Sequence, residues 1–192
     1  MKNNLTNNIK THLELACRIY VWITLSIYGS GKMMGGQFYR HGKLPEKVAQ
    51  LPLEEVIDFD LAWTFFGYST FYILFIGMSQ LIGAFLLLFE RTKLLGVAVL
   101  IPILLNIIVV DIAFKISWGA MTSAIMYLLA LFYVLYFNKE KVVAAFQALI
   151  NKEVIPAAMN RKQKKWMRLL IAIGIFAAIF FVEQQLLNLV GR

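Results

Sequence analysis

The sequence predicts an all-α, polytopic membrane protein. Of the 192 residues, 60% are hydrophobic and only 16% are charged, and the mean hydropathy is +0.69. Soluble domains usually contain about half apolar and a quarter charged residues. Several apolar runs also approach the roughly 20 residues that a helix needs to cross a membrane. This composition excludes a disordered chain, a collagen-like chain and an ordinary soluble enzyme.

The first predicted span runs from about Leu13 to Met34 and is interrupted by Glu14, Arg18 and Lys32. No small-residue cleavage site follows it, so we expect a retained span and not a cleaved signal peptide. Glu14 and Arg18 stand four residues apart with the acid first, the order that favours an ion pair on a helix. The Arg18 side chain is also long enough to extend its charge toward the nearer headgroups.

Residues 35–68 connect this span to the next one, and they end in an aromatic segment, Leu53–Phe66, typical of a short interfacial helix. Three closely spaced apolar runs then predict three further spans, Ser69–Phe89, Leu94–Phe114 and Gly119–Phe137. Their connections are only a few residues long, so these spans should be antiparallel neighbours.

The C-terminal part begins with a basic segment, residues 138–165. Within it, Lys139–Ile150 has an apolar stripe and predicts an amphipathic helix on the cytoplasmic membrane face. A fifth span is expected from about Trp166 to Val190, with Glu183 inside it. The predicted organisation is a four-helix membrane domain over 1–137, a cytoplasmic connection over 138–165 and a fifth transmembrane helix over 166–192.

Basic residues predict the orientation. The chain has 19 Lys and Arg against 11 Asp and Glu, a net charge of +8. Thirteen of the 19 fall on one predicted side; the other side holds Lys32, Arg40, Lys43, Lys47, Lys115 and Arg192. The positive-inside rule places the N-terminus in the cytoplasm and the C-terminus in the periplasm of a bacterial inner membrane. The positive charge therefore indicates lipid headgroups as its partner, and not nucleic acid.

Residues able to hold a cofactor are scarce. His12 and His41 lie outside the predicted spans, so a haem between two such histidines is not expected. Cys17 is the single cysteine, and no cluster has metal-ligand spacing. We expect no intrinsic cofactor, no metal site and no independent catalytic activity, while an enzymatic role stays open.

Polar residues inside spans are the best functional signal, because hydrocarbon penalises them strongly. Lys32, Gln80, Asn106 and Asp111 predict one outward-opening polar pocket, with Lys32 and Asp111 as a charged pair. Alternatively, they only join helices. Lys115 and Glu183 are interpreted as residues near the membrane interface and not as part of this pocket. Four aromatic residues are either candidates for stacking a flat ligand or interface anchors: Trp63, Tyr68, Tyr72 and Trp118.

Several short motifs resemble the DoxX-like family of integral membrane proteins over roughly residues 15–137. They are Arg18, Tyr28-Gly29-Ser30-Gly31-Lys32, Gly35-Gly36-Gln37-Phe38, Trp63, Phe66-Gly67-Tyr68-Ser69, Tyr72, Ser79-Gln80-Leu81-Ile82-Gly83-Ala84 and Arg91-Thr92. The resemblance implies a DoxX-type four-helix bundle, here with a fifth helix. Gln80 stands where the family often has Glu, and Asp111 stands where Asn is common.

Members of that family have been linked to thiosulfate:quinone oxidoreduction, to oxidative-stress complexes and to membrane-protein assembly, so the resemblance does not select one activity. The first hypothesis is an accessory subunit of a quinone-linked membrane redox complex, with a membrane or redox protein as partner and quinone as the ligand to test. Two alternatives stay open. One is a non-enzymatic assembly factor or chaperone for membrane proteins, and the other is a carrier of small solutes or protons.

Overall fold

The computed structural model describes residues 2–150, 173–175, 181 and 185. Over these residues the chain forms helices and turns and no strand, which confirms the all-α prediction. The chain divides into two units, Met1–Phe146 and Gln147–Arg192. Most of the predicted fifth span, with Glu183, lies outside the described residues.

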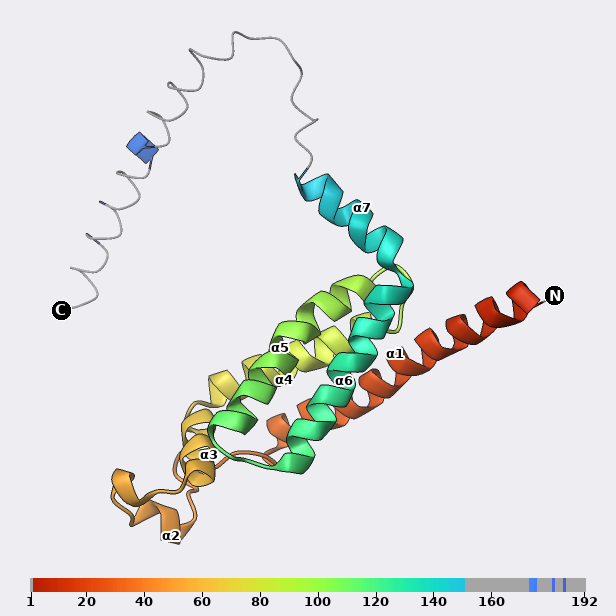
Figure 1. The fold of residues 1–192 in the computed structure, drawn as a ribbon. Coiled ribbons are helices and arrows are strands. Elements are labelled where there is room, and N and C mark those ends of the chain that lie inside the picture. Colours follow the sequence, from red (N-terminus) through yellow and green to blue (C-terminus); the bar gives the residue numbers. More distant parts are fainter. Residues whose placement is uncertain (1, 151–172, 176–180, 182–184, 186–192) are drawn as a thin grey trace. The chain divides into compact units, whose positions relative to one another are not determined.

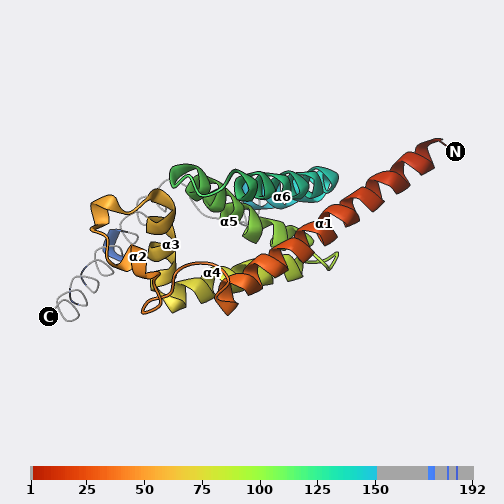
Figure 2. The ribbon, with the colours of Figure 1, turned by 90° about the horizontal axis from the view of Figure 1, so that it is seen from below.

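Four long helices build the first unit: α1 (Lys2–Met34), α4 (Thr70–Leu86), α5 (Lys93–Ala113) and α6 (Trp118–Phe137). They pack as a ring in which α1 contacts α4 and α6, and α5 contacts the same two helices. Figures 1 and 2 show them side by side, with the N-terminal turns of α1 extending past the others. Three short helices lie between α1 and α4: α2 (Glu46–Ala49), a 3₁₀ helix (Leu53–Glu55) and α3 (Asp58–Tyr68).

The observed boundaries agree with the predicted ones at some helices and differ at others. Helices α5 and α6 begin and end within one residue of the predicted spans, and α7 (Lys139–Ile150) has the predicted bounds. Helix α1 begins at Lys2 instead of Leu13, and α4 ends at Leu86 instead of Phe89. The start of α4 is capped by Ser69, whose hydroxyl oxygen accepts the backbone N–H of Tyr72 at 3.3 Å.

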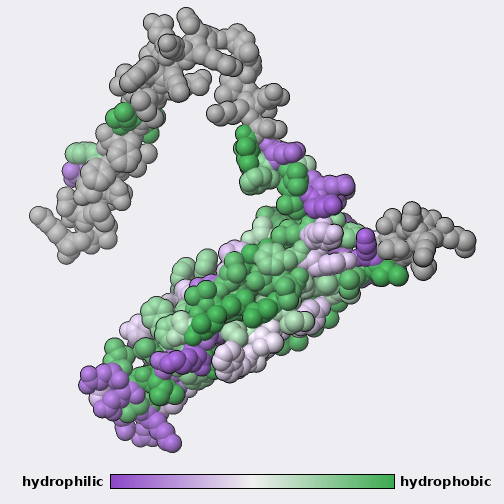
Figure 3. Space-filling model, viewed as in Figure 1, coloured by the Kyte–Doolittle hydropathy of each residue, from purple (hydrophilic) through white to green (hydrophobic). Residues whose placement is uncertain are grey.

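Two helices, α5 and α6, are long and apolar enough to cross a membrane. Helices α3 and α4 pass the same test only when taken together, and they meet at a 91° bend. Helix α1 is long enough, but its charged and polar residues lower its hydropathy. The face shown in Figure 3 is largely hydrophobic over the bundle, and hydrophilic residues gather at the end that α2 and α3 form. Among the described residues, two helices are therefore candidate spans, or three if the bent pair is one span, where the sequence predicts four.

Glycines allow the four helices to pack closely. A Cβ atom added to Gly96 of α5 would lie 2.7 Å from the backbone oxygen of Gly83 in α4. One added to Gly77 of α4 would lie 3.1 Å from the backbone oxygen of Gly29 in α1. Backbones this close leave no room for a side chain. Around them a core of buried apolar residues forms, including Val21, Leu25, Leu87, Val97, Leu100, Leu104, Leu131 and Val134.

The turn after α1 brings residues 35–40 against α3. Gly35 has a φ of +90°, and the N–H of Gly36 donates to the carbonyl oxygen of Gly31 at 2.9 Å, a Schellman-type helix end. The Tyr39 N–H then donates to the Trp63 carbonyl oxygen at 3.1 Å. A Cβ atom on Gly67 would lie only 2.0 Å from the Tyr39 oxygen, so α3 requires glycine there. The packing of Tyr39 against α3 holds residues 35–40 in place beside the pocket described below.

Candidate ligand pocket

The large pocket is a cavity of about 440 Å³ between α4 and α5, beside α3 and the turn after α1. Most of its wall is apolar, formed by residues such as Phe38, Phe66, Phe75, Ile76, Pro102 and Ile103. This volume falls in the range of small-molecule sites, which are mostly apolar with a few polar groups.

Polar side chains gather at one part of this wall: Lys32, Gln37, Asn106 and Asp111. Lys32 is 5% exposed, and its ammonium group donates a hydrogen bond of 3.0 Å to Oε1 of Gln80, which is fully buried. Gln80 lines a small second pocket of about 70 Å³. Because Lys32, Asp111 and Trp63 line both cavities, the small pocket adjoins the polar wall of the large one.

Two residues that line these pockets, Asp111 in both and Gln80 in the small one, each have a buried polar atom without a hydrogen-bond partner within the described part of the chain. These atoms are the amide nitrogen Nε2 of Gln80, a donor, and the carboxylate oxygen Oδ2 of Asp111, an acceptor. Leaving such a group unpaired costs on the order of 1–3 kcal/mol. Most native proteins satisfy nearly all buried polar atoms, so unpaired ones beside a cavity indicate a functional site.

All four residues predicted for the polar pocket line these cavities. Lys32 and Asp111 line both, Asn106 lines the large one and Gln80 the small one. The direct partner of the Lys32 ammonium is Gln80, while Asp111 interacts with it electrostatically through space. A direct or water-mediated contact between Lys32 and Asp111 stays a prediction.

The predicted stacking residues separate into two groups. Trp63 lines both cavities and Tyr72 lines the large one. Tyr68 and Trp118 are 64% and 83% exposed, and neither lines these two cavities. Tyr68 instead places its ring 4.8 Å from that of His41. Trp118 lines a third cavity of about 220 Å³, together with Asp111 and Lys115.

An aromatic cluster borders the large pocket. Phe38 contacts Trp63 edge-on at 5.4 Å, and Phe66 stacks with Tyr72 at 5.8 Å between ring centroids. Phe38 has a φ of +72°, an uncommon conformation for a bulky residue that often marks a functional position. The sequence places Phe38 and Phe66 in family-like motifs but does not predict that they line a pocket.

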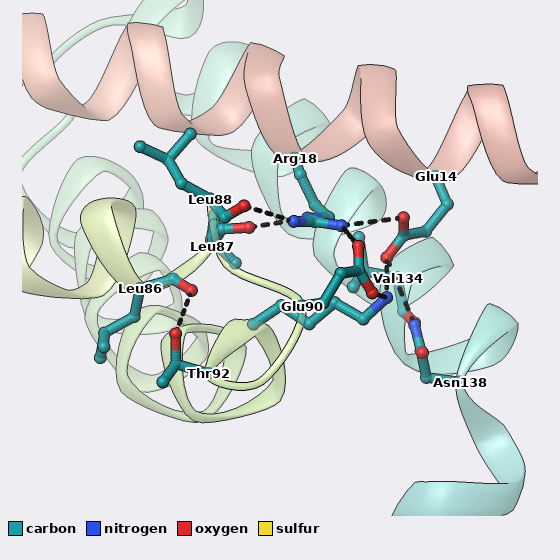
Figure 4. A network of polar contacts seen from close by, with 10 residues as sticks. Glu14, Arg18, Leu86, Leu87, Leu88, Glu90, Thr92, Val134 and Asn138 are labelled. Atoms are coloured by element: carbon teal, nitrogen blue, oxygen red, sulfur yellow. Dashed lines mark hydrogen bonds and ion pairs between the residues drawn. The ribbon is translucent and has the colours of Figure 1, made fainter.

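A second polar cluster, the Arg18 network, joins Glu14, Arg18, Glu90, Lys93 and Asn138. Figure 4 labels all of these residues except Lys93. Arg18 donates from Nε to the Leu87 carbonyl oxygen at 2.7 Å and from Nη2 to that of Leu88 at 2.8 Å. Its Nη1 group donates to both Glu14 and Glu90. The network thereby connects α1 to the turn between α4 and α5.

Lys93 and Asn138 complete the network from α5 and the end of α6. The Lys93 Nζ atom lies 2.8 Å from Oε1 of Glu14 and 2.7 Å from Oε2 of Glu90. Asn138 donates to Glu14 at 3.4 Å. Hydrogen bonds from Lys93 and then Arg18 hold the pKa of Glu90 below its usual value. Two acids and two bases are thus mutually paired, which indicates a structural role.

The i, i+4 pair of Glu14 and Arg18 is confirmed, at 3.3 Å. The expectation that Arg18 extends toward headgroups is wrong, because its side chain is 2% exposed and binds the carbonyl groups that follow α4. Lys115 is 82% exposed in its side chain and pairs with Asp58 at 2.8 Å. This hydrogen bond raises the pKa of Lys115.

Comparisons with known proteins give one similar chain. The protein is 29% identical over 139 residues to the uncharacterized protein YwoB of Bacillus subtilis, which covers 72% of this chain and 85% of YwoB. No protein-family model and no solved structure matches the chain. Across the described residues, no group of three or more His, Cys, Asp or Glu could hold a metal ion.

Proposed function

We propose that the protein is an integral membrane subunit that binds a quinone-type ligand in the large pocket and serves a membrane redox partner. The observation that carries this proposal is an apolar cavity of about 440 Å³ whose lining includes the buried cation Lys32 and Asp111, a residue with an unpaired carboxylate oxygen. The resemblance to DoxX-like proteins supports the redox partner, since members of that family have been linked to thiosulfate:quinone oxidoreduction.

The lining fits an amphiphile with a flat polar ring and an apolar tail. Trp63, Phe38 and Tyr72 offer aromatic surfaces on which a ring can stack. The Lys32 ammonium, which is held by Oε1 of Gln80, is a donor for a ring oxygen. The apolar residues of α4 and α5, such as Ile76 and Ile103, suit the tail. A quinone supplies two-electron redox chemistry, while these residues bind and orient it.

The proposal includes a topology. Helices α1 and α4 join α5 and α6 as spans, with the helix pair α3–α4 bent where it meets the membrane surface. The basic residues of 138–165 favour a cytoplasmic position for the end of α6. The Arg18 network then lies at the cytoplasmic end of the bundle, and the large pocket lies in its outer half.

Purification from native membranes in mild detergent, followed by identification of the extracted small molecules and of partner proteins, tests the proposal. We expect a bound quinone and saturable binding of added decyl-ubiquinone. Lys32→Met should weaken that binding about tenfold or more, because a charge-assisted hydrogen bond is lost. Lys115→Met is the matched control, since Lys115 is an exposed cation outside the large pocket.

Absence of saturable quinone binding would refute the proposal. A stable complex with an apolar client protein and no bound ligand would instead favour the assembly-factor alternative. Equal weakening by Lys32→Met and Lys115→Met would show that binding does not use the polar wall of the pocket.

A further inference from the structure

We infer that the pocket binds the reduced, hydroquinone form of its ligand more tightly than the oxidised quinone form. This inference rests on the proposed function and adds a preference for one redox form. It follows from which hydrogen-bonding groups the polar wall leaves unpaired, and above all from Asp111.

Asp111 has a special place in the bundle. It lines the large pocket, the small pocket and the third pocket, and no other residue lines all three. The residue is 9% exposed, and its Oδ2 oxygen has no hydrogen-bond partner among the residues that the structure describes. Because Asp111 is part of the lining of the large pocket, a ligand bound there lies beside this residue.

The groups that surround Asp111 come from every helix of the bundle. Lys32 and Tyr28 of α1, Gln80 of α4 and Tyr127 of α6 line the small pocket with it, and Lys115 lines the third pocket. Lys115 is already paired with Asp58. Lys32 is the buried cation that interacts with Asp111, so an ionised Asp111 leaves this part of the bundle electrically neutral.

The two redox forms differ in what they can offer these groups. A quinone oxygen only accepts hydrogen bonds, so it can satisfy the donor Lys32 but not the carboxylate of Asp111. A hydroquinone hydroxyl both donates and accepts. It can therefore donate to the Asp111 carboxylate while accepting from Lys32. Oxidation would leave the carboxylate oxygen buried and unpaired, or facing another acceptor.

The size of the preference follows from the one hydrogen bond that distinguishes the two forms. A hydrogen bond to a charged group contributes enough to change a dissociation constant roughly tenfold to a hundredfold. Tighter binding of the reduced form raises the midpoint potential of the bound ligand, by about 30 mV for each tenfold difference.

The test compares decyl-ubiquinone with its hydroquinone, held reduced without oxygen, by equilibrium dialysis against the full-length protein in mild detergent. We expect the hydroquinone to bind at least tenfold more tightly to the natural protein. Asp111→Asn should reduce this difference to less than threefold. Asp58→Asn, the same change at an exposed position outside the large and small pockets, should preserve it.

The outcomes separate this inference from the proposed function. If neither form binds, the proposed function fails. If both forms bind the natural protein equally, the preference is overturned while quinone binding stands, and this comparison needs no variant. A preference that survives in Asp111→Asn would show that Asp111 is not its source.

Discussion

Replacing Arg18 with Met should lower the free energy of unfolding by about 3–5 kcal/mol, the usual effect of removing one partner from a buried ion pair. Methionine retains much of the apolar stem of arginine but none of its donors. The Arg18 side chain is 2% exposed, and its guanidinium group donates to four acceptors: the carbonyl oxygens of Leu87 and Leu88 and the carboxylates of Glu14 and Glu90.

The contacts of Arg18 explain this magnitude. Two carbonyl groups at the end of α4 lose their donor, and each unpaired buried group costs on the order of 1–3 kcal/mol. Glu14 retains Lys93 at 2.8 Å and Asn138 at 3.4 Å, so its charge stays partly compensated. Glu90 is 68% exposed in its side chain and can return to water. The loss should therefore fall toward the lower end of the range.

Unfolding in mild detergent, followed by tryptophan fluorescence, measures the effect. Lys115→Met provides the control, because its ion pair with Asp58 is exposed and its removal should leave stability nearly unchanged. In a double-mutant cycle, Glu14→Gln and Arg18→Met should interact by more than 1 kcal/mol because the two residues share one network. A loss for Arg18→Met as small as that of the control, or simple additivity with Glu14→Gln, would refute the structural role of the network.

Three further predictions test packing, charge and topology. Gly96→Ala should destabilise the protein by about 1–3 kcal/mol in the same unfolding assay, because its Cβ would contact backbone, whereas Gly31→Ala meets nothing within 4 Å and should be neutral or stabilising. The pKa of Glu90 is lowered in the folded state, so the ionised side chain stabilises the folded protein. This contribution to the free energy of unfolding is fully present above the unfolded-state pKa of about 4.3, and it is lost as the pH falls through the folded-state pKa. Glu90→Gln should therefore flatten the decline in thermal stability on acidification. Single cysteines at Lys43 and Gln163, in a Cys17→Ser background, should react with impermeant reagents from opposite sides of the membrane, and reaction from one side would contradict the topology.

Some helices can be delimited from their own sequence pattern, and others end where a distant residue binds them. The bounds of α5 and α6 follow closely from their apolar runs, and those of α7 follow from its apolar stripe. Helix α4 ends earlier than its apolar run because the carbonyl groups of Leu87 and Leu88 turn toward Arg18, a residue about 70 positions away. No pattern within the run itself shows that partner.

The candidate site shows a similar division. Hydrocarbon penalises polar side chains whatever their neighbours are, so Lys32, Gln80, Asn106 and Asp111 could be selected from sequence. Their mutual contacts depend on how the helices are rotated, which the close approach of Gly29 and Gly77 sets in α1 and α4. The 91° bend between α3 and α4 likewise decides that Tyr72 lines the pocket and Tyr68 does not.

The two polar clusters contain similar residue types, and their hydrogen bonding distinguishes their roles. In the Arg18 network, buried Arg18, Lys93 and Glu14 each have several partners, so the cluster joins helices and leaves nothing for a ligand. At the pockets, Asp111 keeps a buried atom unpaired in the lining of the large cavity, and Gln80 keeps one in the lining of the small cavity that adjoins it. An arrangement that served stability alone would favour apolar residues at these positions, since unpaired buried groups are costly. The pocket is therefore where binding should be sought, and the Arg18 network is the structure that holds it in place.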